Sequence, residues 1–184
     1  LAVEGYINNK KEEEIFVTNL SSSMALDKLA EKHDCIIERS AVGEINVVQK
    51  MLALNSKLGG EGNGGVILKE SHLGRDSLVG AAMVLNRMAQ EKSKISKIHS
   101  KLPQFFMVKD KIILDSIDKD LVEEKVKDFF SDAEINSIDG LKLIWKDRWI
   151  HIRGSNTEPI MRIYAEASSK KEAEILVAQV KACL

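Results

Sequence analysis

The densest group of side chains that can bind an anion lies near the C-terminus, in the segment RGSNTEP at residues 153–159. It combines a guanidinium, a glycine, two hydroxyls and an amide, and a second arginine follows in the next predicted strand. A phosphate dianion is bound best by a planar guanidinium together with several neutral N–H and O–H donors. The candidate phosphate-binding residues are Arg153, Gly154, Ser155, Asn156, Thr157 and Arg162. A polar turn whose side chains bond the local backbone is an about equally good interpretation of the same residues.

A second candidate site lies in the glycine-rich segment GGEGNGG at residues 59–65. Its two polar side chains suit sugar hydroxyls, because Glu61 can accept from two vicinal hydroxyls while Asn63 can donate and accept. The segment is not a phosphate-binding P-loop, since no Gly-Lys-Ser/Thr follows, and its glycines precede a strand where a dinucleotide fingerprint precedes a helix. A tight turn between strands is the alternative, and the glycines alone favour it.

The elements around the glycine-rich segment predict an α/β domain. Short apolar, β-branched runs indicate buried strands, and apolar residues at helical spacing indicate helices. We expect strands at 15–20, 35–41 and 66–68, and helices at 24–33, 44–54 and 76–90. Strands that alternate with helices of this length imply a parallel sheet covered by helices. The opening residues LAVEG read as one more strand.

The second half predicts a small α+β domain with a mainly antiparallel sheet. A polar, basic segment at 92–103 that ends in Pro103 is interpreted as a linker or domain boundary. Beyond it we expect a strand or bent strand pair at 105–114, a helix at 121–130, a hairpin at 141–152, a strand at 160–166 and a helix at 168–182. The expected domains are therefore residues 1–98 and 99–184.

Charge and composition exclude several classes of protein. The 184 residues include 27 basic and 28 acidic side chains, and neither half is basic, which argues against nucleic acid and anionic membranes as partners. No apolar run is long enough to span a membrane. Cys35 and Cys183 are too few and too distant for a disulfide framework or a zinc site. A reducing, cytoplasmic setting is expected.

The histidines provide no obvious general base. His151 alternates with Arg153 along a predicted strand, so its side chain could face the phosphate segment. A half-buried structural histidine is the favoured interpretation.

Taken together, these segments resemble the C-terminal part of the α-D-phosphohexomutase superfamily, which includes phosphoglucomutase, phosphomannomutase and phosphoglucosamine mutase. The resemblance keeps the same order along nearly the whole chain. RGSNTEPIMRIYAEA resembles the phosphate-binding loop of the fourth domain, and GGEGNGG stands where the third domain carries its sugar-specificity loop. SAVGEINVVQKM and GRDSLVGAAMVL also resemble segments of the third domain.

The resemblance implies a role for each candidate residue. Arg153, Ser155, Asn156, Thr157 and Arg162 would bind the phosphate at the substrate end remote from the transfer. Glu61 and Asn63 would orient the sugar, and Glu44 corresponds to a variable position that influences substrate preference. Many members carry Glu-x-Ser-Gly-His in the sugar loop, whereas here Asn63 replaces the serine and Gly65 the histidine. Archaeal and some bacterial members share the form found here.

The superfamily's catalytic-serine loop and aspartate-rich magnesium loop are not in this sequence. The resemblance therefore implies a substrate-binding fragment that works with N-terminal domains 1 and 2 of the same protein and is inactive alone. The reaction it implies moves phosphate between C1 and C6 of a hexose phosphate through a phosphoserine and a hexose 1,6-bisphosphate, with Mg²⁺ held outside this chain. Glucose, mannose and glucosamine remain open as the sugar. A non-catalytic phosphosugar-binding interaction module is the alternative.

Overall fold

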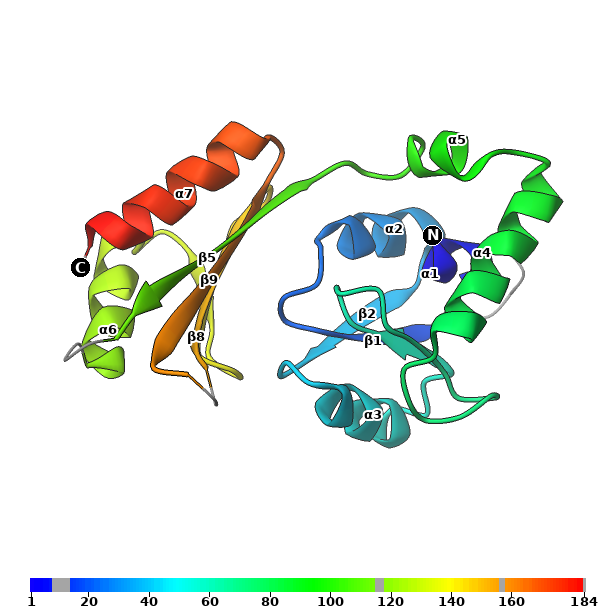
Figure 1. Ribbon diagram of the computed structural model, residues 1–184, viewed down its shortest axis with the longest axis horizontal. Helices are drawn as coiled ribbons and strands as arrows, with labels where there is room; N and C mark the ends of the chain where they lie inside the picture. Colours follow the sequence, from blue (N-terminus) through cyan, green and yellow to red (C-terminus); the bar gives the residue numbers. More distant parts are fainter. Residues whose placement is uncertain (8–13, 115–117, 156–157, 184) are drawn as a thin grey trace. The chain divides into compact units, whose positions relative to one another are not determined.

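The computed structural model describes residues 1–7, 14–114, 118–155 and 158–183 and consists of two compact units (Figure 1). The first unit is Leu1–Gln104 and the second is Phe105–Leu184. Among the described residues, no helix is long and apolar enough to cross a membrane.

The first unit is an α/β sheet in the order β2-β1-β3-β4. Its strands are β1 (Ile15–Asn19), β2 (Ile36–Ser40), β3 (Leu58–Gly60) and β4 (Val66–Leu68). Its helices are α1 (Ala2–Ile7), α2 (Ala25–His33), α3 (Glu44–Ala53), α4 (Ser77–Glu91) and α5 (Ile95–His99). The strands β2, β1 and β3 run parallel, and β4 is antiparallel to β3.

Alternate residues of β1 supply the cores on the two faces of this sheet, because successive strand side chains point in opposite directions. Val17 packs with Val47, Val48 and Met51 of α3. Phe16 packs on the other face with Ile7 of α1, and Met83 of α4 contacts that cluster. Helices therefore cover both faces, as a mostly parallel sheet requires.

The second unit is an antiparallel sheet in the order β5-β9-β8-β7-β6. Its strands are β5 (Phe106–Ile113), β6 (Glu134–Asn136), β7 (Leu141–Ile144), β8 (Trp149–Gly154) and β9 (Ile160–Ala167). Both of its helices, α6 (Lys119–Phe129) and α7 (Lys170–Ala182), lie on the same face of the sheet (Figure 1). Val126 and Val177 pack there against Ile152 and Ile163. Among the residues of this unit that the structure describes, no helix therefore covers the opposite face.

The structure confirms the expected fold class, a helix-covered, mostly parallel sheet followed by an antiparallel α+β unit. The expectation of a strand at the start of the chain is wrong, because residues 2–7 form helix α1. The segment 92–103, expected to be a linker, contains α5, whose Ile98 is 1% exposed. The short strands β3 and β6 were not expected.

Helix α1 is held in the first unit by a buried ion pair. Nη2 of Arg87 in α4 donates to the Glu4 carboxylate over 2.5 Å, and both side chains are 5% exposed. Lys32 Nζ also donates to Glu4, over 3.0 Å. Burial raises the pKa of Glu4, but the bonds from Lys32 and Arg87 outweigh it and bring the pKa to about 2.

We expect Glu4→Gln to lower the free energy of unfolding of the first unit by about 2 kcal/mol, because the buried Arg87 guanidinium loses one of its two carboxylate partners and keeps only Glu91. Both tryptophans, Trp145 and Trp149, belong to the second unit. The loss should therefore appear in urea unfolding followed by far-UV circular dichroism and not by tryptophan fluorescence. Glu31→Gln, which alters the exposed Lys28–Glu31 pair of α2, is the matched control and should change neither transition. Equal effects of the two substitutions would contradict the role given to Glu4.

Candidate functional site

The candidate sugar-binding residues Glu44 and Glu61, and two residues that contact Glu61, lie at the carboxyl ends of the parallel strands of the first unit. Asn19 is the last residue of β1, Gly43 ends the connection from β2 to α3, Glu44 begins α3, and Glu61 directly follows β3. Ligands of α/β sheets bind at this edge. The topology thus brings together Glu44 and Glu61, which are far apart in sequence.

The segment around Glu61 is the turn of the β3–β4 hairpin. The amide of Glu61 donates to the Gly65 carbonyl over 2.9 Å, and the amide of Gly64 donates to the Glu61 carbonyl over 3.1 Å. The Asn63 side chain accepts from the Gly65 amide over 3.1 Å. The tight-turn interpretation therefore describes the backbone correctly, and the turn also determines where Glu61 stands.

The Glu61 carboxylate is held by three segments of the chain. Its Oε1 accepts from Asn19 Nδ2 over 2.9 Å and from the Gly43 amide over 3.2 Å. Its Oε2 lies 3.1 Å from Arg75 Nη1. The Glu61 side chain is only 5% exposed, so these partners stabilise a charge that is largely withdrawn from water.

Asn19 and Gly43 are themselves arranged to donate. Oδ1 of Asn19 accepts from the Ser21 amide and the Ser22 hydroxyl, each over 3.0 Å, which turns Nδ2 toward Glu61. Gly43 has φ of +123°, a conformation that side chains disfavour, and its amide points at the carboxylate.

Glu44, the first residue of α3, contacts the same arginine. Arg75 Nε donates to Glu44 Oε2 over 2.6 Å, and the Arg75 amide donates to Oε1 over 3.3 Å. These bonds from Arg75 lower the pKa of Glu44. Arg75 therefore stands between the two carboxylates that sequence reasoning singled out.

In the second unit, strand register places three cations side by side. Arg162 of β9 is directly opposite Lys111 of β5 on one side and Arg153 of β8 on the other. Residues that face each other across antiparallel strands project from the same face of the sheet. This cation row, Lys111–Arg162–Arg153, lies on the face that α6 and α7 leave uncovered.

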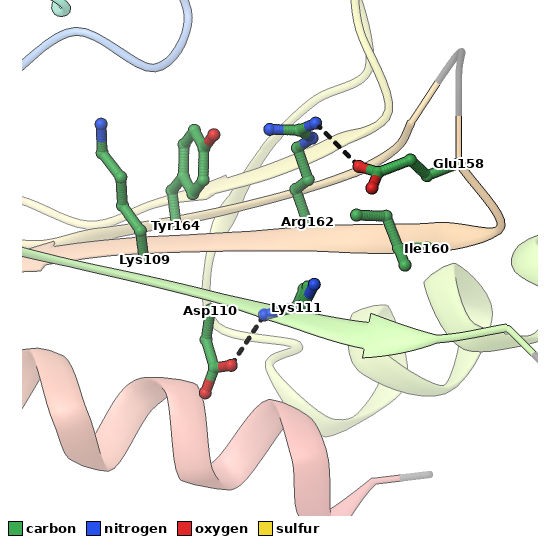
Figure 2. A pocket seen from close by; sticks show the side chains of 7 residues that line it. All are labelled: Lys109, Asp110, Lys111, Glu158, Ile160, Arg162 and Tyr164. Carbon is green, nitrogen blue, oxygen red and sulfur yellow. Dashed lines mark hydrogen bonds and ion pairs between the residues drawn. The ribbon is translucent and has the colours of Figure 1, made fainter.

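Two members of the row contribute to a cavity of about 480 Å³, which is lined by Lys109, Asp110, Lys111, Glu158, Ile160, Arg162 and Tyr164. Figure 2 shows Lys109, Tyr164 and Arg162 pointing to the same side of the sheet, while Asp110 points toward α7. Asp110 pairs there with Lys181 over 2.5 Å. Besides Glu158 and Ile160, the cavity therefore presents three cations and the Tyr164 hydroxyl.

The two arginines of the row are only weakly neutralised. Arg153 Nη1 lies 3.3 Å from Asp139 Oδ2, and Arg162 Nη2 lies 3.5 Å from Glu158 Oε2. Their Nε atoms are buried and have no hydrogen-bond partner among the described residues. Like charges directly opposite each other destabilise a sheet, and an anion placed over them would remove that repulsion.

The remaining phosphate candidates lie at the end of the same strand pair. Gly154 is the last residue of β8, and the Ser155 amide donates to the Ile160 carbonyl over 2.9 Å, closing the base of the loop. Asn156 and Thr157 lie outside the described residues. Over the described part of the chain, no group of three or more His, Cys, Asp or Glu side chains is arranged to hold a metal ion.

His151 is buried in β8, two residues before Arg153, and is 1% exposed. Its Nε2 lies 2.7 Å from the Asp139 carbonyl, the geometry of a neutral ring donating to that oxygen. Burial lowers the pKa of His151 to about 4, and the charges of Lys142 and Arg153 act in the same direction. At neutral pH this histidine therefore adds no charge to the cation row.

Comparison with known proteins identifies the family. Residues 1–106 match the model of the phosphoglucomutase/phosphomannomutase alpha/beta/alpha domain III, and residues 108–182 match that of the phosphoglucomutase/phosphomannomutase C-terminal domain. The chain belongs to the phosphoglucomutase/phosphomannomutase family. The resemblance drawn from the two loops is thereby confirmed at the level of the family.

Individual relatives agree with this placement. The chain is 34% identical over 161 residues to a phosphoglucomutase/phosphomannomutase of Thermococcus kodakarensis, covering 86% of this chain and 35% of that protein. It is 30% identical over 178 residues to a phosphoglucosamine/phosphogalactosamine mutase of Sulfurisphaera tokodaii, covering 95% and 39%. A crystal structure of a family protein from Burkholderia thailandensis shares the fold with a TM-score of 0.81 at 20% identity, covering 99% of this chain and 39% of that one. The chain thus spans less than half the length of these relatives.

Three residues that contribute to these sites were not predicted from the sequence. Asn19 ends an apolar strand and reads as part of it, although an amide at the end of a predicted parallel strand is itself a signal. Lys111 becomes part of the row only through the register of β5 with β9. Arg75 precedes a helix in a polar segment, and only the tertiary structure reveals its two carboxylate partners.

We expect the second unit to lose about 3 kcal/mol of stability as the pH falls from about 6.5 to about 4. The unfolded chain takes up a proton on His151 near its usual pKa of 6.5, whereas the folded chain resists protonation until about 4. The unfolded state therefore binds more protons in this window, and stability is lost as the pH falls. Urea unfolding followed by tryptophan fluorescence from about pH 7.5 to about pH 5 measures most of this slope before the carboxylates titrate.

His151→Gln keeps a donor for the Asp139 carbonyl and should flatten the slope. His99→Gln, at an exposed position on α5 in the first unit, is the control and should leave it unchanged. A slope that persists in His151→Gln would show that another group is responsible.

Proposed function

We propose that this chain forms the third and fourth domains of a phosphohexomutase and binds its hexose phosphate substrate. In this proposal the first unit recognises the sugar through Glu61, Asn63 and Glu44. The second unit binds the phosphate remote from the transfer. The observation that carries the proposal is the row of three cations, which sits on the helix-free face of a sheet at the base of the RGSNTEP loop.

The phosphate site that we propose consists of Arg153, Gly154, Ser155, Asn156, Thr157 and Arg162, with Lys111 as an addition. Two guanidiniums and an ammonium supply the positive charge, and the loop backbone and hydroxyls supply neutral donors. Such a site binds the phosphate dianion without distinguishing one sugar from another. That suits a bisphosphate intermediate whose two ends must occupy the same place in turn.

The phosphoryl chemistry belongs, on this proposal, to domains outside this chain. Mg²⁺ would offset the charge that develops on the transferred phosphoryl group. The acidic side chains that the structure describes form no cluster suited to hold this ion. The role of this chain is to hold the phosphate and the sugar so that the reacting oxygen is presented to the other domains.

A non-catalytic phosphosugar-binding module is the second candidate, since the same two sites would serve it. The two candidates differ in turnover. The complete coding frame that carries this chain should interconvert glucose 1-phosphate and glucose 6-phosphate, or the mannose or glucosamine pair, with Mg²⁺ present. The 184-residue chain alone should not. Turnover by the chain alone would refute the assignment of the chemistry to other domains, and no turnover by the complete protein with any of these sugars would favour the module.

We expect Arg153→Ala to weaken binding of inorganic phosphate and of glucose 1-phosphate to the 184-residue chain by at least about tenfold, since it removes a charge-assisted donor. Lys111→Ala should weaken both by a smaller factor, and more than Lys109→Ala, which removes the cation that lies over the Tyr164 ring. Isothermal titration calorimetry at low ionic strength measures these changes.

Lys146→Ala is the control for loss of positive charge, because Lys146 is exposed in the connection between β7 and β8, away from the row. It should leave both affinities unchanged. Unaltered phosphate binding by Arg153→Ala would refute the proposed phosphate site, whereas a weakening by Lys146→Ala equal to that by Lys111→Ala would show a general effect of charge.

A further inference from the structure

We propose that Arg75 is a positioning residue that couples Glu44 to Glu61 and thereby sets how Glu61 meets the sugar. This inference rests on the proposed function and names a residue to which the loop motifs assign no role. It makes Glu44 an indirect determinant of sugar recognition, acting through the guanidinium.

The geometry gives Arg75 separate contacts for the two carboxylates. Its Nε and its backbone amide bond the two oxygens of Glu44, over 2.6 and 3.3 Å. Its Nη1 faces Oε2 of Glu61 at 3.1 Å. Because the guanidinium is planar and rigid, fixing Nε against Glu44 also fixes the direction in which Nη1 points.

Arg75 matters for recognition because Glu61 has little acceptor capacity left. A carboxylate offers about four lone-pair positions, two on each oxygen. Asn19 and Gly43 fill both positions on Oε1, and Arg75 takes one on Oε2. A sugar hydroxyl can therefore bond to Glu61 through one remaining position on Oε2, beside the guanidinium. The placement of Arg75 thus determines which acceptor position of Glu61 Oε2 stays available to the sugar.

The expectation that Glu61 accepts from two vicinal hydroxyls changes accordingly. With its present partners in place, Glu61 can accept a hydrogen bond from one sugar hydroxyl. A second hydroxyl bond requires that Asn19, Gly43 or Arg75 release the carboxylate.

Gly65 and Arg75 form a matched pair. A Cβ built on Gly65 would lie 2.2 Å from Arg75 Cδ and 2.8 Å from Cγ, and its third nearest neighbour, at 3.3 Å, is Arg75 Cβ. A side chain at position 65 and the observed position of Arg75 therefore exclude each other. This gives a physical reason for glycine here, where many members of the superfamily carry histidine.

A purely structural role is the alternative, in which Arg75 only ties the segment before α4 to α3. The two roles differ in selectivity. A structural tie affects stability and lowers activity on every substrate alike. A positioning residue changes how strongly the enzyme distinguishes a sugar from an analogue that lacks one hydroxyl.

The test uses the complete enzyme that carries this chain, with its best hexose 1-phosphate and the monodeoxy analogues of that sugar phosphate. The wild type should prefer the parent sugar over at least one analogue, the one that lacks the hydroxyl bound by Glu61. Arg75→Ala should reduce this preference by about tenfold or more, chiefly by raising KM for the parent sugar. Arg75→Lys should restore only part of it, because an ammonium cannot bond Glu44 and Glu61 in the same fixed geometry.

Two further variants test the coupling directly. Gly65→Ala should reproduce the loss of preference, and in the Arg75→Ala background it should add little, because its clash is with Arg75. Glu44→Gln should reduce the preference in the wild type and not in the Arg75→Ala background. Lys50 lies on the same helix as Glu44, and Lys50→Ala removes its ion pair with Glu38 of β2. It is the control and should leave the preference unchanged.

The thermal midpoint of each variant separates folding from recognition. An Arg75→Ala enzyme that keeps the wild-type preference overturns the proposal, whatever its stability. So does a Glu44→Gln effect that persists without Arg75. A complete protein that neither binds nor converts any hexose phosphate refutes the proposed function instead, and that result is distinct because it concerns the wild type.

Discussion

A carboxylate that is almost fully withdrawn from water organises the first unit. Glu61 stands at the carboxyl edge of the sheet with its side chain 5% exposed, and an ionised group in that position requires charge and hydrogen-bond donors. The end of β1 supplies Asn19, the connection from β2 to α3 supplies Gly43, and the segment before α4 supplies Arg75. The need to stabilise the charge of Glu61 therefore accounts for Asn19, Gly43 and Arg75 at the ends of separate elements. The hairpin turn that positions Glu61 belongs to the same arrangement.

The second unit meets the opposite electrostatic problem. Its sheet has one face packed against α6 and α7, and the alternation of side chains places Lys111, Arg162 and Arg153 on the other face. Register then brings Lys111, Arg162 and Arg153 into a row. A row of cations with long contacts to carboxylates is unfavourable by itself. The first unit neutralises the charge of Glu61 with its own residues. The second unit keeps a row of positive charges that a bound phosphate would neutralise.

Much of the fold could be predicted because its main strands and helices carry strong local patterns, such as the β-branched run IFVTN of β1 and the amphipathic α6. Helix α1 could not, since AVEGYI has no clear period and its Glu4 depends on Arg87, far along the chain. Strand β3 is Leu-Gly-Gly, whose glycines have no strand propensity, and only its pairing with β1 and β4 specifies it. The site shows the same division. The chemistry of the RGSNTEP loop is local, whereas Lys111 and Arg75 join their sites through register and tertiary contact.

On the proposed function, the first unit would recognise the sugar and the second unit would bind the phosphate. The proposed phosphate site takes its charge from the cation row, and His151, which lies in the same strand as Arg153, stays neutral at neutral pH because burial lowers its pKa to about 4. His151 therefore adds no charge to that site near neutral pH. The proposed sugar site instead uses Glu61, whose partners Asn19, Gly43 and Arg75 leave one acceptor position for a hydroxyl. The proposed phosphate site would accept either end of a hexose bisphosphate, and Glu61 would have to bond an equivalent hydroxyl in both orientations of the sugar. Placing the two proposed sites on separate units would allow the sugar site to change while the phosphate site stays the same.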